Sequence, residues 1–129
     1  MAHRQSLALV LEDTELGRWA LTKALEAGGF EVRSAQTWTE ASAWLRTTRY
    51  ALVLAAVSLA PGSAADLAAE IRSDQPDAHV VLLTDPDSID ELRRACGPEP
   101  EILPKPFDLE AAAQAALSRW GSADHTVEA

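Results

Sequence analysis

Short apolar runs alternate with segments of helical periodicity along almost the whole of this 129-residue chain. The apolar runs predict strands at residues 7–11, 30–34, 50–56, 79–84 and 101–103. The helical segments between and after them are residues 14–27, 37–46, 63–73, 87–95 and 108–120. Strict strand–helix alternation favours a parallel sheet covered by helices on both faces. With right-handed crossovers, this becomes a doubly wound, three-layer α/β sandwich with a five-stranded sheet.

Two of the predicted helices show an apolar face or a candidate N-terminal capping residue. One face of the predicted helix 14–27 holds apolar residues at helical spacing, namely Leu16, Ala20, Ala24 and Ala27. Trp19 and Leu25 lie close to that face. Thr37 or Thr39 is expected to cap the second helix.

Composition limits the classes of function. Hydrophobic residues make up 47% of the chain, as expected of a folded domain, and the formal net charge is −9. Phosphate backbones would repel such a chain, so no direct nucleic-acid binding is expected. Cys96 is the single cysteine, which excludes an intrachain disulfide. The sequence has no long apolar span and no signal-peptide pattern, so we expect no membrane association and a cytoplasmic location.

Two carboxylates follow the first predicted strand. Glu12 and Asp13 would lie at the carboxyl edge of the sheet, where doubly wound folds bind ligands. One interpretation is a site for a hard cation such as Mg²⁺, which prefers oxygen ligands. The other is a helix N-terminus, where Asp13, Thr14 and Glu15 satisfy free backbone donors. The sequence alone leaves both open.

Two further segments end at the same edge. Thr84 closes the fourth strand, a position at which most threonines are ordinary strand residues or caps. Lys105 stands between Pro104 and Pro106, which hold it in extended geometry. It is either a fixed ammonium directed into the carboxylate site or part of a tight strand-to-helix turn.

Taken together, these motifs resemble a known family. The acidic pair after the first strand, "YALVL" in the third strand, "VVLLT" in the fourth and "LPKPFDLEAA" at the end are similar to response-regulator receiver domains of two-component signalling. The resemblance covers residues 5–120, which leaves 121–129 as a tail or the start of a linker. It implies a flavodoxin-like (βα)5 fold in a bacterial signalling protein. The stretch "GRWALTKALEAGGFEV" together with "LPKPFDLEAA" looks most like receivers of nitrogen-regulation-class transcription activators.

The resemblance assigns roles to individual positions. Glu12 and Asp13 match the acidic pair that holds Mg²⁺, with Asp13 the more direct ligand. Thr84 matches the switch hydroxyl, and Lys105 matches the lysine that pairs with phosphoryl oxygens. Ala56 falls where the family has its phospho-accepting aspartate.

Further departures accompany Ala56. Ala60 stands where a proline commonly follows the acceptor loop, Asp85 where receivers keep a small residue, and Ile102 where they have an aromatic switch residue. A methyl group cannot act as the nucleophile that receives a phosphoryl group. The Mg²⁺ site also loses a carboxylate and is expected to be weak at most, unless Asp85 supplies a substitute. Alternatively, Asp85 has a purely structural role as the cap of the helix that begins near Asp87.

The sequence therefore predicts a phosphorylation-independent pseudo-receiver, not an enzyme, that acts through protein contacts. The expected partner is a second copy or another protein, with a covalently linked output domain as a further option. In receivers the face of the fourth helix, fifth strand and fifth helix carries dimer contacts, which here draws on residues 89–95, 101–103 and 109–120. Residual Mg²⁺-dependent phosphoryl chemistry and small-ligand binding at the sheet edge are the alternatives.

Overall fold

Five parallel strands form one sheet in the computed structural model, which describes residues 6–98 and 100–104. The strands are β1 (Ser6–Leu11), β2 (Phe30–Ala35), β3 (Leu52–Ala56), β4 (His79–Thr84) and β5 (Glu101–Pro104). Their order across the sheet is β2-β1-β3-β4-β5. All five predicted strands are confirmed, and only their ends move by one or two residues.

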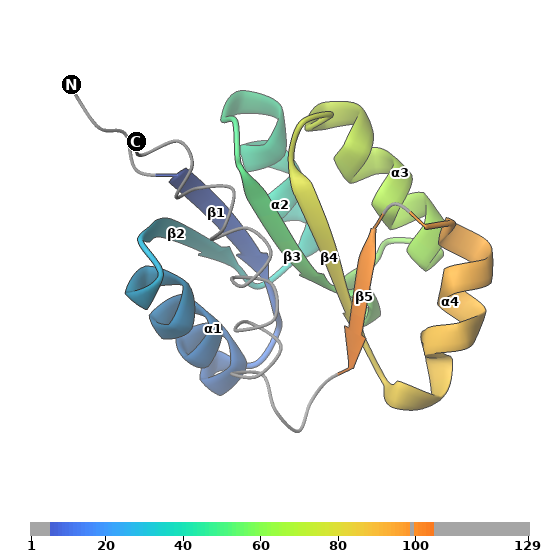
Figure 1. Ribbon diagram of the computed structural model, residues 1–129. Helices are drawn as coiled ribbons and strands as arrows, with labels where there is room; N and C mark the ends of the chain where they lie inside the picture. Colours follow the sequence, from blue (N-terminus) through green and yellow to red (C-terminus); the bar gives the residue numbers. More distant parts are fainter. Residues whose placement is uncertain (1–5, 99, 105–129) are drawn as a thin grey trace.

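Helices cover both faces of this sheet (Figure 1). They are α1 (Glu15–Ala27), α2 (Trp38–Thr47), α3 (Ala64–Asp74) and α4 (Ile89–Cys96). Two short 3₁₀ helices, η1 (Val57–Leu59) and η2 (Pro86–Ser88), follow β3 and β4. The predicted three-layer α/β sandwich is thereby confirmed. The predicted final helix 108–120 and the tail 121–129 lie outside the described residues.

The strands divide their side chains between two hydrophobic cores. In β3, Val53 and Ala55 belong to the core beneath α2, α3 and α4, whereas Leu52 and Leu54 belong to the core beneath α1. Strands β1 and β4 alternate in the same way. Successive side chains of a strand point to opposite faces, so a continuous apolar run is what a strand covered on both sides requires.

Hydroxyl side chains start three of the helices. Thr14 accepts a hydrogen bond from Gly17 N, Thr37 from Glu40 N and Ser63 from Asp66 N, each three residues into its helix. Each bond satisfies a backbone donor that the first helical turn leaves unpaired. The predicted cap at Thr37 is therefore confirmed over Thr39.

The buried face of α1 differs from the predicted one. Leu21, Ala24 and Leu25 point into the core together with Gly17, while Leu16 is 74% exposed and Ala27 is exposed. An alanine-rich helix offers two apolar faces a small rotation apart. The larger side chains, Leu21 and Leu25, bury more apolar area and decide which face packs.

Gln75 fastens the ends of two helices to the start of β3. The residue is 2% exposed, and its Nε2 donates to the carbonyls of Leu45 at 2.8 Å and Thr48 at 2.6 Å. Its Oε1 accepts from Tyr50 N at 2.9 Å. One amide therefore satisfies three backbone groups, one in the last turns of α2 and two in the segment that leads from α2 to β3.

We predict that Gln75→Leu destabilises the fold by about 2–4 kcal/mol, because it leaves buried backbone donors and acceptors without partners. Urea denaturation monitored by circular dichroism measures the change. Ser73→Ala, an exposed change on α3, is the control and is expected to stay within about 0.5 kcal/mol. A Gln75→Leu protein as stable as the wild type would contradict the assigned role.

Candidate functional site at the carboxyl edge of the sheet

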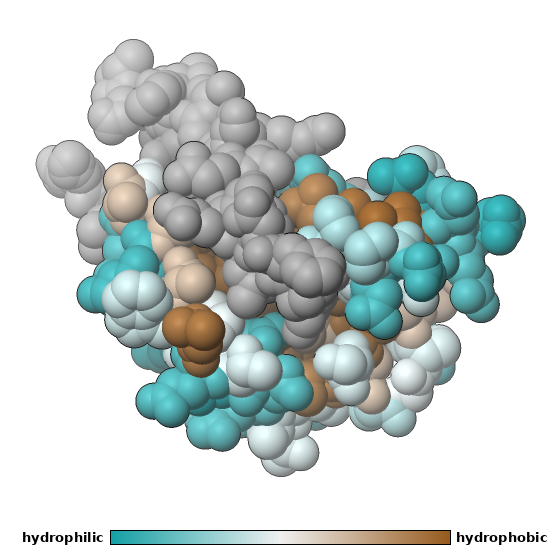
Figure 2. Space-filling view, turned by 90° about the horizontal axis from the view of Figure 1, so that it is seen from below, coloured by the Kyte–Doolittle hydropathy of each residue, from teal (hydrophilic) through white to brown (hydrophobic). Residues whose placement is uncertain are grey.

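The strand register brings most of the predicted site residues to one edge. Leu11 pairs with Ala55, Ala56 with Leu83, and Thr84 with Pro104. Glu12 and Asp13 therefore follow β1 at the edge where β3 and β4 end. Figure 2 views the molecule from this end. Lys105 lies outside the described residues.

Glu12 is buried at the start of α1. It is 1% exposed, and its Oε2 accepts hydrogen bonds from the Thr14 hydroxyl at 2.7 Å and from Thr14 N at 3.2 Å. The same hydroxyl accepts from Gly17 N at 3.0 Å. The carboxylate thus holds the capping threonine, and the threonine holds the first turn of the helix.

Gly17 leaves the room that this carboxylate occupies. A Cβ at residue 17 would lie 2.6 Å from the Thr14 hydroxyl oxygen and 2.8 Å from Glu12 Oε2. Such contacts are shorter than side chains tolerate. The sequence interpretation missed this residue, although a glycine in the first turn of a predicted helix is an unusual choice that could have marked it.

Asp13 differs from its neighbour. Its side chain is exposed and makes no hydrogen bond within the described part of the chain, while its carbonyl accepts from Arg18 Nη1 at 3.1 Å. Arg18 also donates to the Glu12 carbonyl at 3.0 Å. The helix N-terminus interpretation is confirmed for Thr14, the observed cap, and Glu15 lies in the first turn as that interpretation requires, whereas the Asp13 side chain makes no cap hydrogen bond. Glu12, which that interpretation did not include, supports the cap through Thr14.

The remaining site residues present little polar chemistry. Ala56 is completely buried at the last position of β3, and Thr84 is 8% exposed at the end of β4. Asp85 is exposed and takes the position before η2, but its side chain makes no cap hydrogen bond. The predicted helix 87–95 begins instead at Ile89, after the 3₁₀ turn that opens at Pro86. Ile102 is 4% exposed and packs in the core beneath α2, α3 and α4.

The donor set of this edge does not complete a divalent-cation site. Within residues 6–98 and 100–104, no three His, Cys, Asp or Glu side chains are arranged to hold a metal ion. One Glu12 oxygen is already bonded to Thr14, and Ala56 offers only a methyl group. Asp13 is left as the exposed carboxylate beside it. These residues alone fit Mg²⁺ poorly.

Two other titratable groups lie away from this edge. His79 Nε2 is 3.0 Å from Glu101 Oε1, at the opposite end of β4 and β5. Cys96 ends α4, and burial raises the pKa of its thiol. A raised pKa keeps the sulfur protonated at neutral pH, so this cysteine is not an activated nucleophile.

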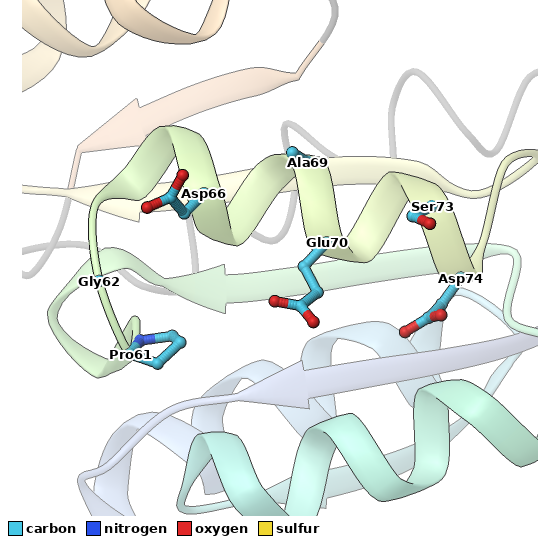
Figure 3. A pocket seen from close by; sticks show the side chains of 7 residues that line it. All are labelled: Pro61, Gly62, Asp66, Ala69, Glu70, Ser73 and Asp74. Atoms are coloured by element: carbon cyan, nitrogen blue, oxygen red, sulfur yellow. The ribbon is translucent and has the colours of Figure 1, made fainter.

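An open groove of about 540 Å³ runs along α3 (Figure 3). It is lined by Pro61, Gly62, Asp66, Ala69, Glu70, Ser73 and Asp74. The carboxylates of Glu70 and Asp74 project from the same side of the helix. The groove contains none of the predicted site residues.

Comparison with known proteins identifies relatives of the whole domain. The family model described as the response regulator receiver domain matches residues 8–117. No curated protein matches the chain. A helix able to cross a membrane is not found in the described residues.

Several solved structures of the same fold are similar to this chain over most of their own length. A response regulator protein from Burkholderia pseudomallei, with a phosphorylated aspartic acid, calcium ion and citrate, is 27% identical with a TM-score of 0.70, over 96% of this chain and 73% of that one. The response regulator protein TrrA from Thermotoga maritima, in complex with Mg²⁺-BeF, is 26% identical with a TM-score of 0.69, over 86% and 96%. The chemotaxis response regulator CheY4 of Vibrio cholerae is 21% identical with a TM-score of 0.74, over 90% and 98%, and supports the fold alone.

We predict that Gly17→Ala lowers stability by about 1–3 kcal/mol, because the added methyl group displaces Glu12 or Thr14. The sign is informative, since glycine to alanine inside an unobstructed helix raises stability by about 1 kcal/mol. Thermal unfolding measures the change. Lys23→Ala on the exposed side of α1 is the control, expected within about 0.5 kcal/mol of the wild type. A rise in the Gly17→Ala midpoint would show that the carboxylate does not need this space.

Proposed function

Since the chain belongs to the response regulator receiver domain family, we propose that it is an atypical receiver that signals without being phosphorylated at residue 56. The observation that carries the proposal is Ala56 itself, a buried methyl group at the last position of β3. In the family resemblance this position belongs to the aspartate that accepts the phosphoryl group. A methyl group has no lone pair with which to attack phosphorus.

Nearby residues do not replace the missing nucleophile. Ser58 is exposed in η1, two residues beyond the strand, and a serine would not form the acyl phosphate on which receivers depend. The similar protein from Burkholderia pseudomallei contains a phosphorylated aspartic acid, which this chain lacks at residue 56. We propose accordingly that the chain is not an enzyme of phosphoryl transfer.

Magnesium binding is proposed to be weak. The fold family implies a Mg²⁺ ion held by Glu12 and Asp13, which when bound would neutralise charge at the phosphorylation site. Here Glu12 is bonded to Thr14, and residue 56 contributes no oxygen. Asp13 remains, with Asp85 as the side chain that could add a carboxylate at the neighbouring strand end. Lys105, which the resemblance pairs with phosphoryl oxygens, would balance these carboxylates.

The proposed output is contact with another protein in the bacterial cytoplasm. The face that would carry self-association comprises α4, β5 and the predicted last helix 109–120. Helix α4 is amphipathic, with Leu92 buried and charges of both signs outside, Asp90 and Glu91 before Arg93 and Arg94. An output domain linked after residue 120, as in receivers of nitrogen-regulation-class activators, belongs to the same proposal.

We predict that incubation with acetyl phosphate and Mg²⁺ leaves the intact mass of the wild-type protein unchanged. The variant Ala56→Asp supplies the missing carboxylate and is expected to gain the mass of one phosphoryl group. Mass spectrometry of the intact protein reads both. A phosphoryl adduct on the wild type would overturn the proposal. An unmodified Ala56→Asp variant would locate a second obstacle at Thr84, Asp85 or Lys105.

We predict that millimolar Mg²⁺ raises the unfolding midpoint of the wild type only slightly, and that Asp13→Asn abolishes that rise. Thermal unfolding in a Mg²⁺ series, with matched ionic strength, measures it. Asp85→Ala is expected to leave the Mg²⁺ dependence unchanged. A clear loss of dependence in Asp85→Ala would mean instead that this residue rebuilds the cation site.

A further inference from the structure

Hydrogen bonds fix both the backbone and the side chain of Glu12. Its backbone N–H donates to the Ala35 carbonyl at 3.1 Å, and its own carbonyl accepts from Arg18 Nη1 at 3.0 Å. Its Oε2 accepts from the Thr14 hydroxyl at 2.7 Å and from Thr14 N at 3.2 Å. The residue is only 1% exposed. Glu12 is therefore tied to β2 through its backbone and to the start of α1 through its carboxylate.

The Thr14 hydroxyl passes this support on to the first turn of α1. A hydroxyl has one proton to donate and two lone pairs with which to accept. Because the proton goes to Glu12, a lone pair is left directed at Gly17 N, 3.0 Å away. The carboxylate thus orients the cap that the helix needs. Gly17 completes the arrangement, since a Cβ there would overlap both of the other groups.

A divalent cation would have to compete with these bonds. Each carboxylate oxygen offers about two lone-pair sites, and two donors from Thr14 already occupy those of Glu12 Oε2. The positive charge of Arg18, bonded to the carbonyls of both acidic residues, opposes a second positive charge beside them. Asp13 differs, because its side chain is exposed and has no hydrogen bond within the described part of the chain.

We propose that Glu12 supports the N-cap of α1 instead of ligating a cation, and that the Thr14 hydroxyl withholds it from cations. The receiver would then have lost its cation site in two places, at residue 12 as well as at residue 56. The inference rests on the proposed function and deepens it, because it adds a second, independent reason for weak Mg²⁺ binding. The disagreement between these residues and a Mg²⁺ site is thus itself informative.

The two roles of Glu12 predict opposite effects of removing its charge. Carboxylates gathered for a cation repel one another when no cation is present, so neutralising one of them stabilises the protein. A carboxylate that supports a cap accepts charge-assisted hydrogen bonds, which a neutral amide replaces with weaker ones. Removing the charge of Glu12 in the absence of metal therefore distinguishes the two roles.

The first experiment measures thermal unfolding of the full chain in EDTA. Glu12→Gln is expected to lower the midpoint by about 5 °C. Asp13→Asn removes the same charge from the adjacent residue and is the matched control, expected to unfold no lower than the wild type. A Glu12→Gln midpoint equal to or above that of the wild type would overturn the proposal.

The second experiment measures Mg²⁺ affinity by isothermal titration calorimetry in the Ala56→Asp background, where residue 56 again offers a carboxylate. Adding Thr14→Val removes the hydroxyl and is expected to tighten binding about 10-fold, the order of one hydrogen bond to a charged group. Adding Thr14→Ser keeps the hydroxyl and is expected to change nothing. Adding Glu12→Gln to the Thr14→Val protein is expected to cancel the gain. Circular dichroism checks that each variant folds.

Three calorimetric results would count against the assigned role of Thr14. They are equal affinities in the valine and serine variants, a gain that persists after Glu12→Gln, and no Mg²⁺ binding by the valine variant. The outcomes also separate this inference from the proposed function. A phosphoryl adduct on the wild type would overturn the proposed function, yet a lower midpoint of Glu12→Gln in EDTA would still assign Glu12 to the cap.

Discussion

Burial of both faces of the parallel sheet is the constraint on which the rest of this structure depends. A sheet covered on both sides needs strands whose successive side chains are apolar, and β1, β3 and β4 supply them to two separate cores. Parallel strands joined by helices must all end at one edge. The same edge therefore holds the acidic pair Glu12 and Asp13, Ala56 and Thr84, because each follows or ends one of these parallel strands.

Most of the fold could be predicted from the sequence because its signals are local. Continuous apolar runs mark the strands, and Thr37 marks the start of α2. The face of α1 could not be predicted as reliably. Its many alanines fit two orientations, and only the packing of Leu21 and Leu25 against the sheet selects one. Helix α4 begins at Ile89, two residues later than predicted, because Pro86 opens a 3₁₀ turn before the helix.

The sequence predicted which residues lie at the edge of the candidate site, but not which contacts their side chains make. The strand ends told us that Glu12 and Asp13 share an edge with Ala56 and Thr84, and the register agrees. They did not tell us that the two carboxylates have different surroundings. One is buried and bonded to Thr14, and the other faces solvent. Two adjacent carboxylates carry no signal in the sequence that tells which of them turns toward the helix.

The close approach at the start of α1 also affects how substitutions combine. Glu12, Thr14 and Gly17 share one small volume, in which the carboxylate, the hydroxyl and a missing methyl group fit only together. The cost of changing one of them depends on which side chains stand at the other two, so their effects on stability will not add. A shorter side chain at residue 12 would remove only one of the two close contacts, because the Thr14 hydroxyl oxygen would still lie 2.6 Å from a Cβ at residue 17. Substitutions at residues 12, 14 and 17 should therefore be tested in combination as well as singly, although nothing in the linear sequence indicates that the three positions are coupled.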